Sequence, residues 1–267
     1  MGWIKTMFKK IIQKNVLWTG LIDVIELFNL KKMAYMMLKQ SCKKNNKNNI
    51  TAPKGKKILM LTISMIEIDC RINKVASSLA AEGYQITIFC PEFRGQKKQL
   101  VIQKISENIT YVRIKPTHLT QKVKMSYQSH FVKASFDFDF DFVHANDLTT
   151  LATGWVIAQQ NRLPLVYDSH EMWSENVTYK NGKYVQMQAR KRFFYQKLEG
   201  RLLKDVTLFY SVSSSILDEY ERRHQRRPKL LANYPDIASL TYKNDTFESL
   251  KESLHLTPEH FVTLYIG

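Results

Sequence analysis

From residue 55 onward, short apolar runs alternate with segments of helical periodicity. The first run covers 57–63, and the next segment, 71–82, repeats apolar residues at helical spacing through Ile72, Val75 and Leu79. Further apolar runs lie at 86–90, 109–114, 141–145, 164–167, 206–212 and 229–232, with helical patterns over 148–160, 184–204 and 214–222. Uninterrupted apolar runs are typical of strands buried on both faces. Strands alternating with such helices predict an α/β fold with a doubly wound parallel sheet.

Polar and titratable residues gather where the predicted strands end, which is where a sheet of this kind has its ligand crevice. The candidates are Asp69 and Arg71 after the first strand, His144, Asn146 and Asp147 after the fourth, and Asp168, His170, Glu171 and Glu175 after the fifth. Two histidines near adjacent strand ends favour a functional cluster over two isolated core histidines. Asp147 is also placed to cap the helix beginning at Leu148, and the two roles are compatible.

Several common nucleotide- and metal-binding motifs are excluded because the residues that they require are absent from the sequence. The loop 62–69 contains no glycine, so it is neither a dinucleotide-binding G-x-G-x-x-G turn nor a P-loop. Segment 136–142 alternates Phe and Asp but lacks the Gly and Glu of an EF-hand, so it is interpreted as a lead-in to the fourth strand with a packed apolar face. Three cysteines without C-x-x-C spacing indicate neither a disulfide framework nor a zinc site.

The first fifty residues carry an unusual share of the charge. Ten lysines against two acids give residues 1–50 a net charge of +8, half of the +16 of the whole chain. Apolar residues at helical spacing alternate with basic ones, which predicts an amphipathic helical extension lying in a membrane interface. The proposed membrane-binding residues are Trp3, Lys5, Phe8, Lys9 and Lys10. A solvated basic tail, or helices packed on the domain's own core, are the alternatives.

Several stretches resemble family 4 glycosyltransferases of the GT-B type, specifically their Rossmann-like N-terminal, acceptor-side domain. They cover roughly residues 55–240 in the family's order. The most specific is 166–175, Val-Tyr-Asp-Ser-His-Glu-Met-Trp-Ser-Glu; the others include 69–72, 143–147, 198–199, 211–213 and 233–236. The resemblance implies transfer of a sugar from a nucleotide-sugar to a glycan or lipid-linked acceptor. It further implies retention of anomeric configuration and no essential metal or other cofactor.

The resemblance also implies roles for individual residues. His144 matches the family's histidine near the donor sugar, where it would bond the sugar or stabilise developing charge. Four further residues match the loop lining the cleft between domains: Asp168, His170, Glu171 and Glu175. Asp69 and Arg71 match the loop after the first strand. No general base is assigned.

The expected organisation is an N-terminal helical region at 1–50, a Rossmann-like domain at 55–240, and a linker with one strand at 241–267. Segment 261–267 resembles the first strand of the family's donor-binding domain. The chain is therefore expected to lack most of the donor site and to transfer no sugar alone. A separate chain that supplies the C-terminal domain is a candidate partner. It is expected in the cytoplasm, peripheral on the inner face of the cell membrane.

Two other readings remain open at this stage. The first is a non-catalytic acceptor-binding or membrane-associated module. The second, a nucleic-acid binder, is suggested by charge alone and lacks a recognised motif, so no nucleic-acid partner is expected. Glycan or lipid-linked acceptor and anionic membrane surface are the expected partners.

Overall fold

The computed structural model describes residues 56–92, 100–115, 126–234, 249, 251–257 and 259–260. The chain divides into two compact units, 1–232 and 233–267. In the second unit, residues 251–253 are helical. The membrane-binding residues Trp3, Lys5, Phe8, Lys9 and Lys10 and the strand expected at 261–267 lie outside the described residues.

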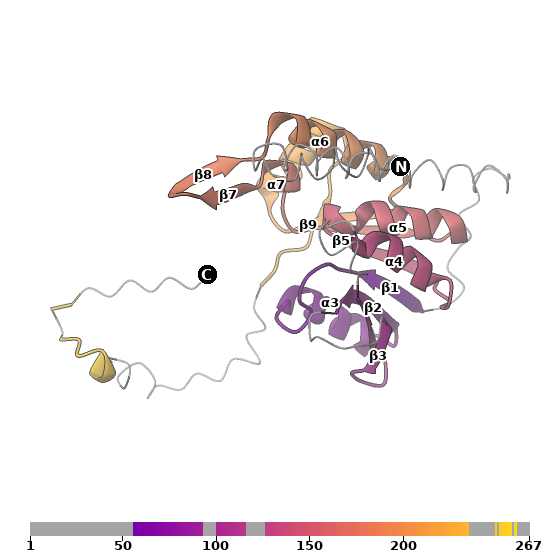
Figure 1. The fold of residues 1–267 in the computed structure, drawn as a ribbon, viewed down its shortest axis with the longest axis horizontal. Helices are drawn as coiled ribbons and strands as arrows, with labels where there is room; N and C mark the ends of the chain where they lie inside the picture. Colours follow the sequence, from indigo (N-terminus) through magenta and orange to yellow (C-terminus); the bar gives the residue numbers. More distant parts are fainter. Residues whose placement is uncertain are drawn as a thin grey trace, which may run out of the picture. The chain divides into compact units, whose positions relative to one another are not determined.

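An eight-stranded sheet forms the centre of the first unit (Figure 1). Its strands are β1 (Lys57–Leu61), β2 (Gln85–Pro91), β3 (Leu100–Lys104), β4 (Ile109–Ile114), β5 (Phe142–Asn146), β6 (Leu165–Ser169), β9 (Leu208–Ser211) and β10 (Lys229–Leu230). They lie in the order β10-β9-β6-β5-β1-β2-β4-β3, and every neighbouring pair is parallel except β3 and β4. The predicted α/β fold with a doubly wound parallel sheet is confirmed. The sequence reading missed β3, a short edge strand whose Ile102 is exposed and whose apolar run is broken by Gln103.

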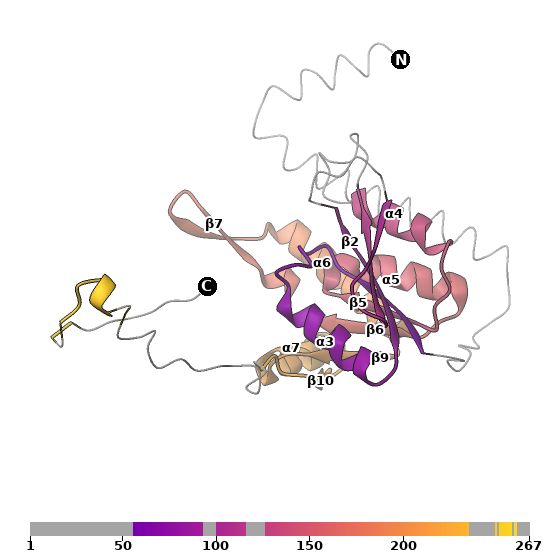
Figure 2. The same cartoon turned by 90° about the horizontal axis from the view of Figure 1, so that it is seen from below.

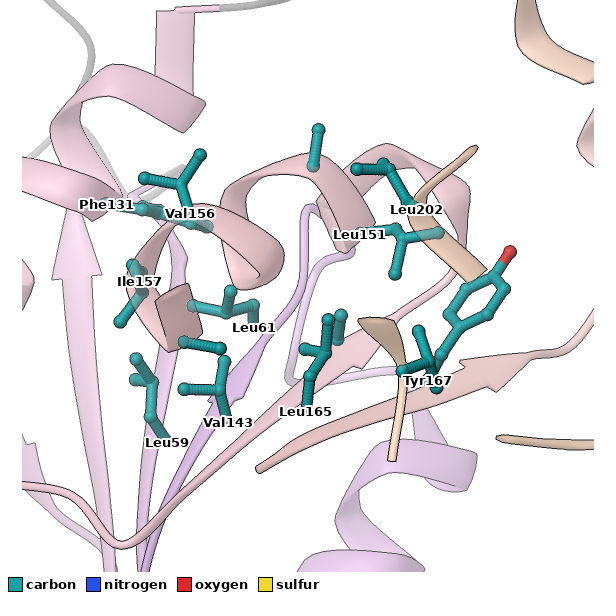
Figure 3. Close-up of a cluster of buried hydrophobic side chains, with 14 of the residues drawn as sticks. Leu59, Leu61, Phe131, Val143, Leu151, Val156, Ile157, Leu165, Tyr167 and Leu202 are labelled. Atoms are coloured by element: carbon teal, nitrogen blue, oxygen red, sulfur yellow. The ribbon is translucent and has the colours of Figure 1, made fainter. Parts of the chain in front are cut away.

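Helices pack on both faces of this sheet. They are α3 (Cys70–Ala81), α4 (Ser126–Ser135), α5 (Leu148–Asn161), α6 (Ala189–Leu202) and α7 (Ser214–His224). α3 buries Ile72 and Ala76 against Met60 of β1 and its neighbours on one face. The other four contribute to the core on the opposite face, around Leu59 and Leu61 (Figure 3). Alternate residues of β1 thus serve opposite cores, as the period-2 geometry of a strand requires.

The Phe/Asp segment is a turn and not a strand, although its apolar side chains do pack. Phe138 and Phe140 stack on each other at 6.1 Å between ring centroids, and both contact Phe89 edge-on. Phe142 begins β5 and meets the opposite core through Tyr84, while Phe136 is exposed. The interpretation as a lead-in with a packed apolar face is confirmed for two of the four phenylalanines. α4, just before this segment, was missed.

A helix over 184–204 was predicted, and its first part is wrong. Residues Val177–Lys180 (β7) and Lys183–Gln186 (β8) form an antiparallel hairpin that projects away from the sheet (Figures 1 and 2). The turn residues Asn181 and Gly182 have φ of 51° and 78°. Asn-Gly between two short β-prone runs is a strong signal for a two-residue hairpin turn, and it outweighs the helical pattern that follows. Helix α6 therefore begins only at Ala189.

Candidate functional site

Strand alternation places the polar candidates on one face of β5, β6 and β9. Tyr167 of β6 and Phe209 of β9 face the core under α5 and α6, stacked at 5.1 Å. Their neighbours Asp168 and Tyr210 are register partners on the other face. His144 and Asn146 lie inside β5, and Asp168 lies inside β6, so the expectation that all three follow their strands is wrong by one to three residues. β5 and β6 extend one and two residues beyond their predicted runs, which takes in Asn146 and Asp168, whereas His144 already lay within the run 141–145.

His144 is buried beneath this cluster. Its residue is 3% exposed, and its Nε2 shares a hydrogen bond of 2.6 Å with the hydroxyl of Tyr210. Asp168 Oδ2 is 3.9 Å from the same nitrogen. Burial lowers the pKa of His144 to about 4, although Asp168 acts in the opposite direction. The imidazole is therefore neutral at physiological pH.

His170 is held by carboxylates on two sides. Its Nε2 lies 2.7 Å from Asp168 Oδ2, and its backbone N–H donates to Asp147 Oδ1 at 3.0 Å. Nδ1 has no hydrogen-bond partner among the described residues, and Asp147 Oδ2 is 3.8 Å away. Burial disfavours the charged ring, but the hydrogen bond to Asp168 and the negative charges of both aspartates raise the pKa of His170 above 6.5. One ring nitrogen is thus fixed while the other remains available.

The two histidines are expected to show opposite titration behaviour. Burial lowers the pKa of His144 to about 4, whereas for His170 the lowering by burial is outweighed by Asp168 and Asp147 together, which raise its pKa above 6.5. Imidazole ¹H–¹⁵N NMR over about pH 4–8 measures both directly, with His144→Gln and His170→Gln as assignments. Titration of both rings at the same pH would contradict this difference in environment.

Asp147 combines a strained backbone with an unusual carboxyl. It precedes α5 as predicted, but its side chain makes no capping hydrogen bond to the helix and bonds the His170 backbone instead. Its φ of 61° and ψ of 164° lie in a region that is essentially restricted to glycine. Burial raises its pKa to about 6; His170 opposes this shift, and Glu171 and Asp168 add to it. Such strain is typical of sites where a side chain must point in one direction.

Substituting Asp147 by glycine and by alanine separates the backbone from the side chain. Both variants lose the carboxylate, but only alanine retains a Cβ at φ 61°. We expect Asp147→Gly to be about 1–3 kcal/mol more stable than Asp147→Ala, which is the reverse of their order in a helix interior. Urea denaturation of both proteins measures the difference. Equal stabilities would show that the backbone relaxes without strain.

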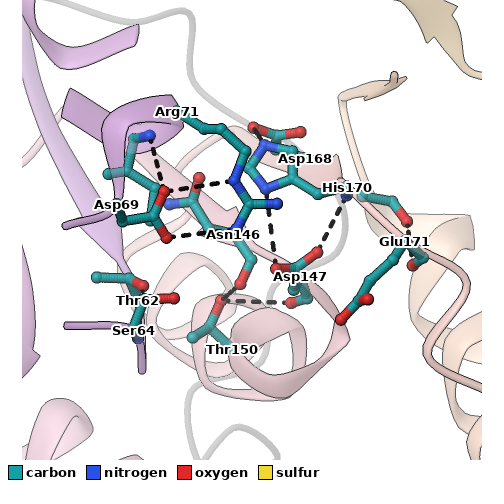
Figure 4. Close-up of polar contacts among 12 residues, drawn as sticks. Thr62, Ser64, Asp69, Arg71, Asn146, Asp147, Thr150, Asp168, His170 and Glu171 are labelled. Atoms are coloured by element: carbon teal, nitrogen blue, oxygen red, sulfur yellow. Dashed lines mark hydrogen bonds and ion pairs between the residues drawn. The ribbon is translucent and has the colours of Figure 1, made fainter. Parts of the chain in front are cut away.

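Arg71, Asp69 and Asn146 complete the cluster around His170 and Asp147 (Figure 4). Asp69 accepts the Ile72 N–H at the start of α3 and holds Arg71 through two contacts of 3.4 Å. The Arg71 side chain is 36% exposed. Asn146 donates to the Leu61 carbonyl at 2.9 Å, and its buried Oδ1 has no hydrogen-bond partner within the described part of the chain. A cation and an unsatisfied acceptor therefore accompany the two carboxylates and the imidazole.

Glu175 and Glu171 do not join the cluster in the same way. Glu175 bonds Arg223 at 2.6 Å and lies 3.5 Å from Arg192, linking its loop to α6 and α7. Although burial acts against it, the Arg223 hydrogen bond lowers the pKa of Glu175. Glu171 is exposed, and its carbonyl accepts from Ser169 Oγ at 3.2 Å. Of the predicted set, Glu175 is thus tied to the helices, and Glu171 lies at the rim.

A buried network behind β6 was missed as part of the site. Glu199 of α6 is 1% exposed, and its Oε1 accepts hydrogen bonds from Tyr167 at 2.7 Å and Tyr220 at 2.6 Å. Tyr220 in turn lies 2.7 Å from Ser169 Oγ, directly before His170. Tyr210 was also missed, although its place beside Phe209 on alternate faces of β9 was a usable signal. Glu199 was noted only as part of the stretch 198–199 that resembles the family, and no role was assigned to it.

Similarity to known proteins identifies the family of this chain. The profile of Glycosyltransferase Family 4 matches residues 71–233, which is more than half of the chain. The chain belongs to glycosyltransferase family 4. No curated protein sequence matches it. The family 4 match contains His144 and every acceptor- or cleft-binding candidate except Asp69, which lies two residues before it.

Solved structures with the GT-B fold are similar to this family 4 chain. A sucrose-phosphate synthase from Thermosynechococcus elongatus has 14% identity and a TM-score of 0.56, covering 77% of this chain and 54% of that one. HepE from Anabaena, in complex with UDP-glucose, has 14% identity and a TM-score of 0.48 over 74% and 50%. A glycosyltransferase from Rickettsia africae has 12% identity and a TM-score of 0.46 over 77% and 51%. The chain thus spans about half the length of the synthase it matches.

Membrane-spanning helices and metal-ligand groups are both absent from the described residues. None of their helices has the length and apolar character needed to cross a membrane. Within the same ranges, no three His, Cys, Asp or Glu side chains are grouped so that they could hold a metal ion.

Proposed function

We propose that this chain supplies the acceptor-side domain of a retaining glycosyltransferase, which transfers a sugar from a nucleotide-sugar to a glycan or lipid-linked acceptor. The observation that carries the proposal is the His170 ring, with Nε2 held by Asp168 and Nδ1 unpartnered. A histidine oriented in this way accepts a proton from a hydroxyl group, or donates to charge that develops in a transition state. Arg71 and Asp147 beside it supply a cation and an acceptor for binding hydroxyl or phosphate groups.

His144 has an indirect role in this proposal. Its side chain is 4% exposed and bonded to Tyr210, so contact with a donor sugar would require one of the two side chains to move. Because the His144 ring is neutral, it does not compete with His170 for an ion pair with Asp168. We therefore assign His144 as a residue that positions Asp168, and Asp168, His170, Asp147, Asn146, Asp69, Arg71 and Glu171 as acceptor- or cleft-binding residues.

The donor is proposed to bind mainly outside the described residues. The chain spans only 54% of the similar synthase, and the loop after β1 has no glycine to cradle a pyrophosphate. Residues 1–267 alone are accordingly expected to turn over no nucleotide-sugar, and a further domain or separate chain would supply the donor site. Release of nucleoside diphosphate from a panel of nucleotide-sugars, with and without acceptor membranes, tests this. Turnover by residues 1–267 alone would overturn that part of the proposal.

Residues 1–40 are proposed to hold the protein on the cytoplasmic face of the membrane. Trp3 and Phe8 supply apolar contacts, and Lys5, Lys9 and Lys10 supply charge for anionic lipid. The full chain should float with anionic liposomes, whereas protein that lacks residues 1–50 should not. Equally weak flotation of both proteins would remove the membrane from the proposal and leave sugar transfer untouched.

A further inference from the structure

A groove of about 550 Å³ lies between α6 and α7, on elements separate from the cluster around His170. None of the described residues that line it is acidic. Its basic lining consists of Lys197, Arg201, Lys204, Arg222, Arg223 and His224. Grooves lined by one sign of charge concentrate ligands of the opposite sign.

Three of these cations are uncompensated. Arg222 and Arg223 pair with Glu219, and Arg223 also pairs with Glu175. Lys197 and Arg201 lie one turn apart on α6 at i, i+4 spacing, and Lys204 follows in the short 3-10 helix Leu203–Asp205 that continues from α6. No carboxylate of the described residues forms an ion pair with any of the three. Like charges at these spacings repel each other, and a bound anion would remove that repulsion.

His224 gives a second, independent sign of a missing ligand. Its side chain is 10% exposed, and its Nε2 is buried without a hydrogen-bond partner in the described structure; the nearest carboxylate oxygen, of Glu199, is 3.9 Å away. The ring lies against Gly200, where a Cβ would come within 2.7 Å of Nδ1. Burial and the charge of Arg223 lower the pKa of His224. Glycine at this helix position thus admits a ring whose buried Nε2 has no hydrogen-bond partner among the described residues, which is unusual in a folded protein.

We propose that the groove between α6 and α7 binds a phosphate ester. A phosphate group offers several acceptor oxygens and up to two negative charges, which suits ammonium, guanidinium and imidazole donors converging from two helices. A carboxylate would compensate only one of the three free charges. A soluble phosphate compound and a phospholipid headgroup share this chemistry. The site does not depend on the proposed sugar transfer.

Calorimetric titration of the full chain with pyrophosphate tests the proposal, alongside flotation with phosphatidylcholine vesicles that contain phosphatidylglycerol. The groove variant carries Lys197→Gln, Arg201→Gln and Lys204→Gln. The matched control carries Lys104→Gln, Lys183→Gln and Lys229→Gln, which removes the same charge from exposed positions elsewhere. Thermal melts confirm that both variants fold.

Pyrophosphate is expected to bind the groove variant at least tenfold more weakly than the wild type, with the control within about twofold. The imidazole NMR signal of His224 should move during the titration. If the groove variant binds pyrophosphate more weakly than the control, the ligand is a soluble phosphate ester. If the groove variant floats less well with the vesicles than the control, the ligand is a phospholipid headgroup. Equal losses in the two variants, no binding of either probe, or an unmoved His224 signal during binding would each overturn the proposal.

Discussion

Replacing Glu199 with alanine is expected to lower the free energy of unfolding by about 3–5 kcal/mol, because two buried hydroxyl groups lose their common acceptor. Tyr167 and Tyr220 both donate to Oε1, and both residues are fully buried. A buried donor without a partner costs about 1–3 kcal/mol, and the smaller side chain adds a cavity. For a domain of this size, the loss corresponds to a fall in Tm of roughly 10 °C.

Glutamine at the same position is the matched control. Since both hydroxyls bond the single atom Oε1, an amide oxygen there preserves both contacts. Glu199→Gln also removes the cost of a buried charge, so its stability is expected to stay within about 1 kcal/mol of the wild type. Urea denaturation of the three proteins measures the difference. A glutamine variant as unstable as the alanine variant would show that the charge, and not the acceptor, holds the network.

The same pair of proteins gives a pH dependence with a defined sign. Burial raises the pKa of Glu199 above its ordinary value of 4.5, although both tyrosine hydrogen bonds act in the opposite direction. The folded protein therefore binds this proton more tightly than the unfolded chain. The stability of the wild type relative to Glu199→Gln is expected to be greatest below about pH 4.5 and to fall as pH rises through the folded-state pKa. A difference that does not change with pH would contradict the raised pKa.

Asp168→Asn is expected to reduce kcat/KM of the active enzyme containing this chain by roughly 10²–10⁴-fold. Asp168 Oδ2 lies 2.7 Å from Nε2 of His170, and a carboxylate at this distance favours the proton on Nε2, which leaves Nδ1 as the unprotonated nitrogen when the ring is neutral. An asparagine amide has the same shape but can donate to Nε2, and this places the proton on Nδ1. The proton acceptor that we assign to the acceptor hydroxyl is then lost.

The change of tautomer can be observed apart from activity. Imidazole ¹⁵N NMR should show the proton of neutral His170 on Nε2 in the wild type and on Nδ1 in Asp168→Asn, with a lowered pKa in the variant. Asp218→Asn, an exposed position on α7, is the control and should retain full activity. Lost activity with an unchanged tautomer would refute the assigned role of His170. An unchanged activity with a shifted tautomer would exclude His170 from the reaction.

Several features of the site follow from local sequence rules. The apolar runs placed β1, β5, β6 and β9 correctly because strands buried on both faces contain little else. Parallel strands bring their carboxyl ends to one edge, so residues as distant as Asp69 and His170 were expected together before any geometry was known. The hairpin at 177–186 was not predicted, because the helical pattern that follows it was extended too far toward the N-terminus. The Asn181–Gly182 pair is itself a signal for a hairpin turn.

The order of apolar and polar residues along the chain thus determined its sheet, most of its helices and the edge at which its polar residues meet. These depend on the period of apolar positions, which is a local property. Only the tertiary structure decided the state of each residue in the cluster. In the folded chain His144 is a buried, neutral ring, and Asp168 forms an ion pair with His170. Glu175 forms an ion pair with Arg223, and the buried Glu199 accepts hydrogen bonds from two tyrosines. Protonation and partner choice depend on desolvation and on distances between residues far apart in the chain, and no local pattern encodes them.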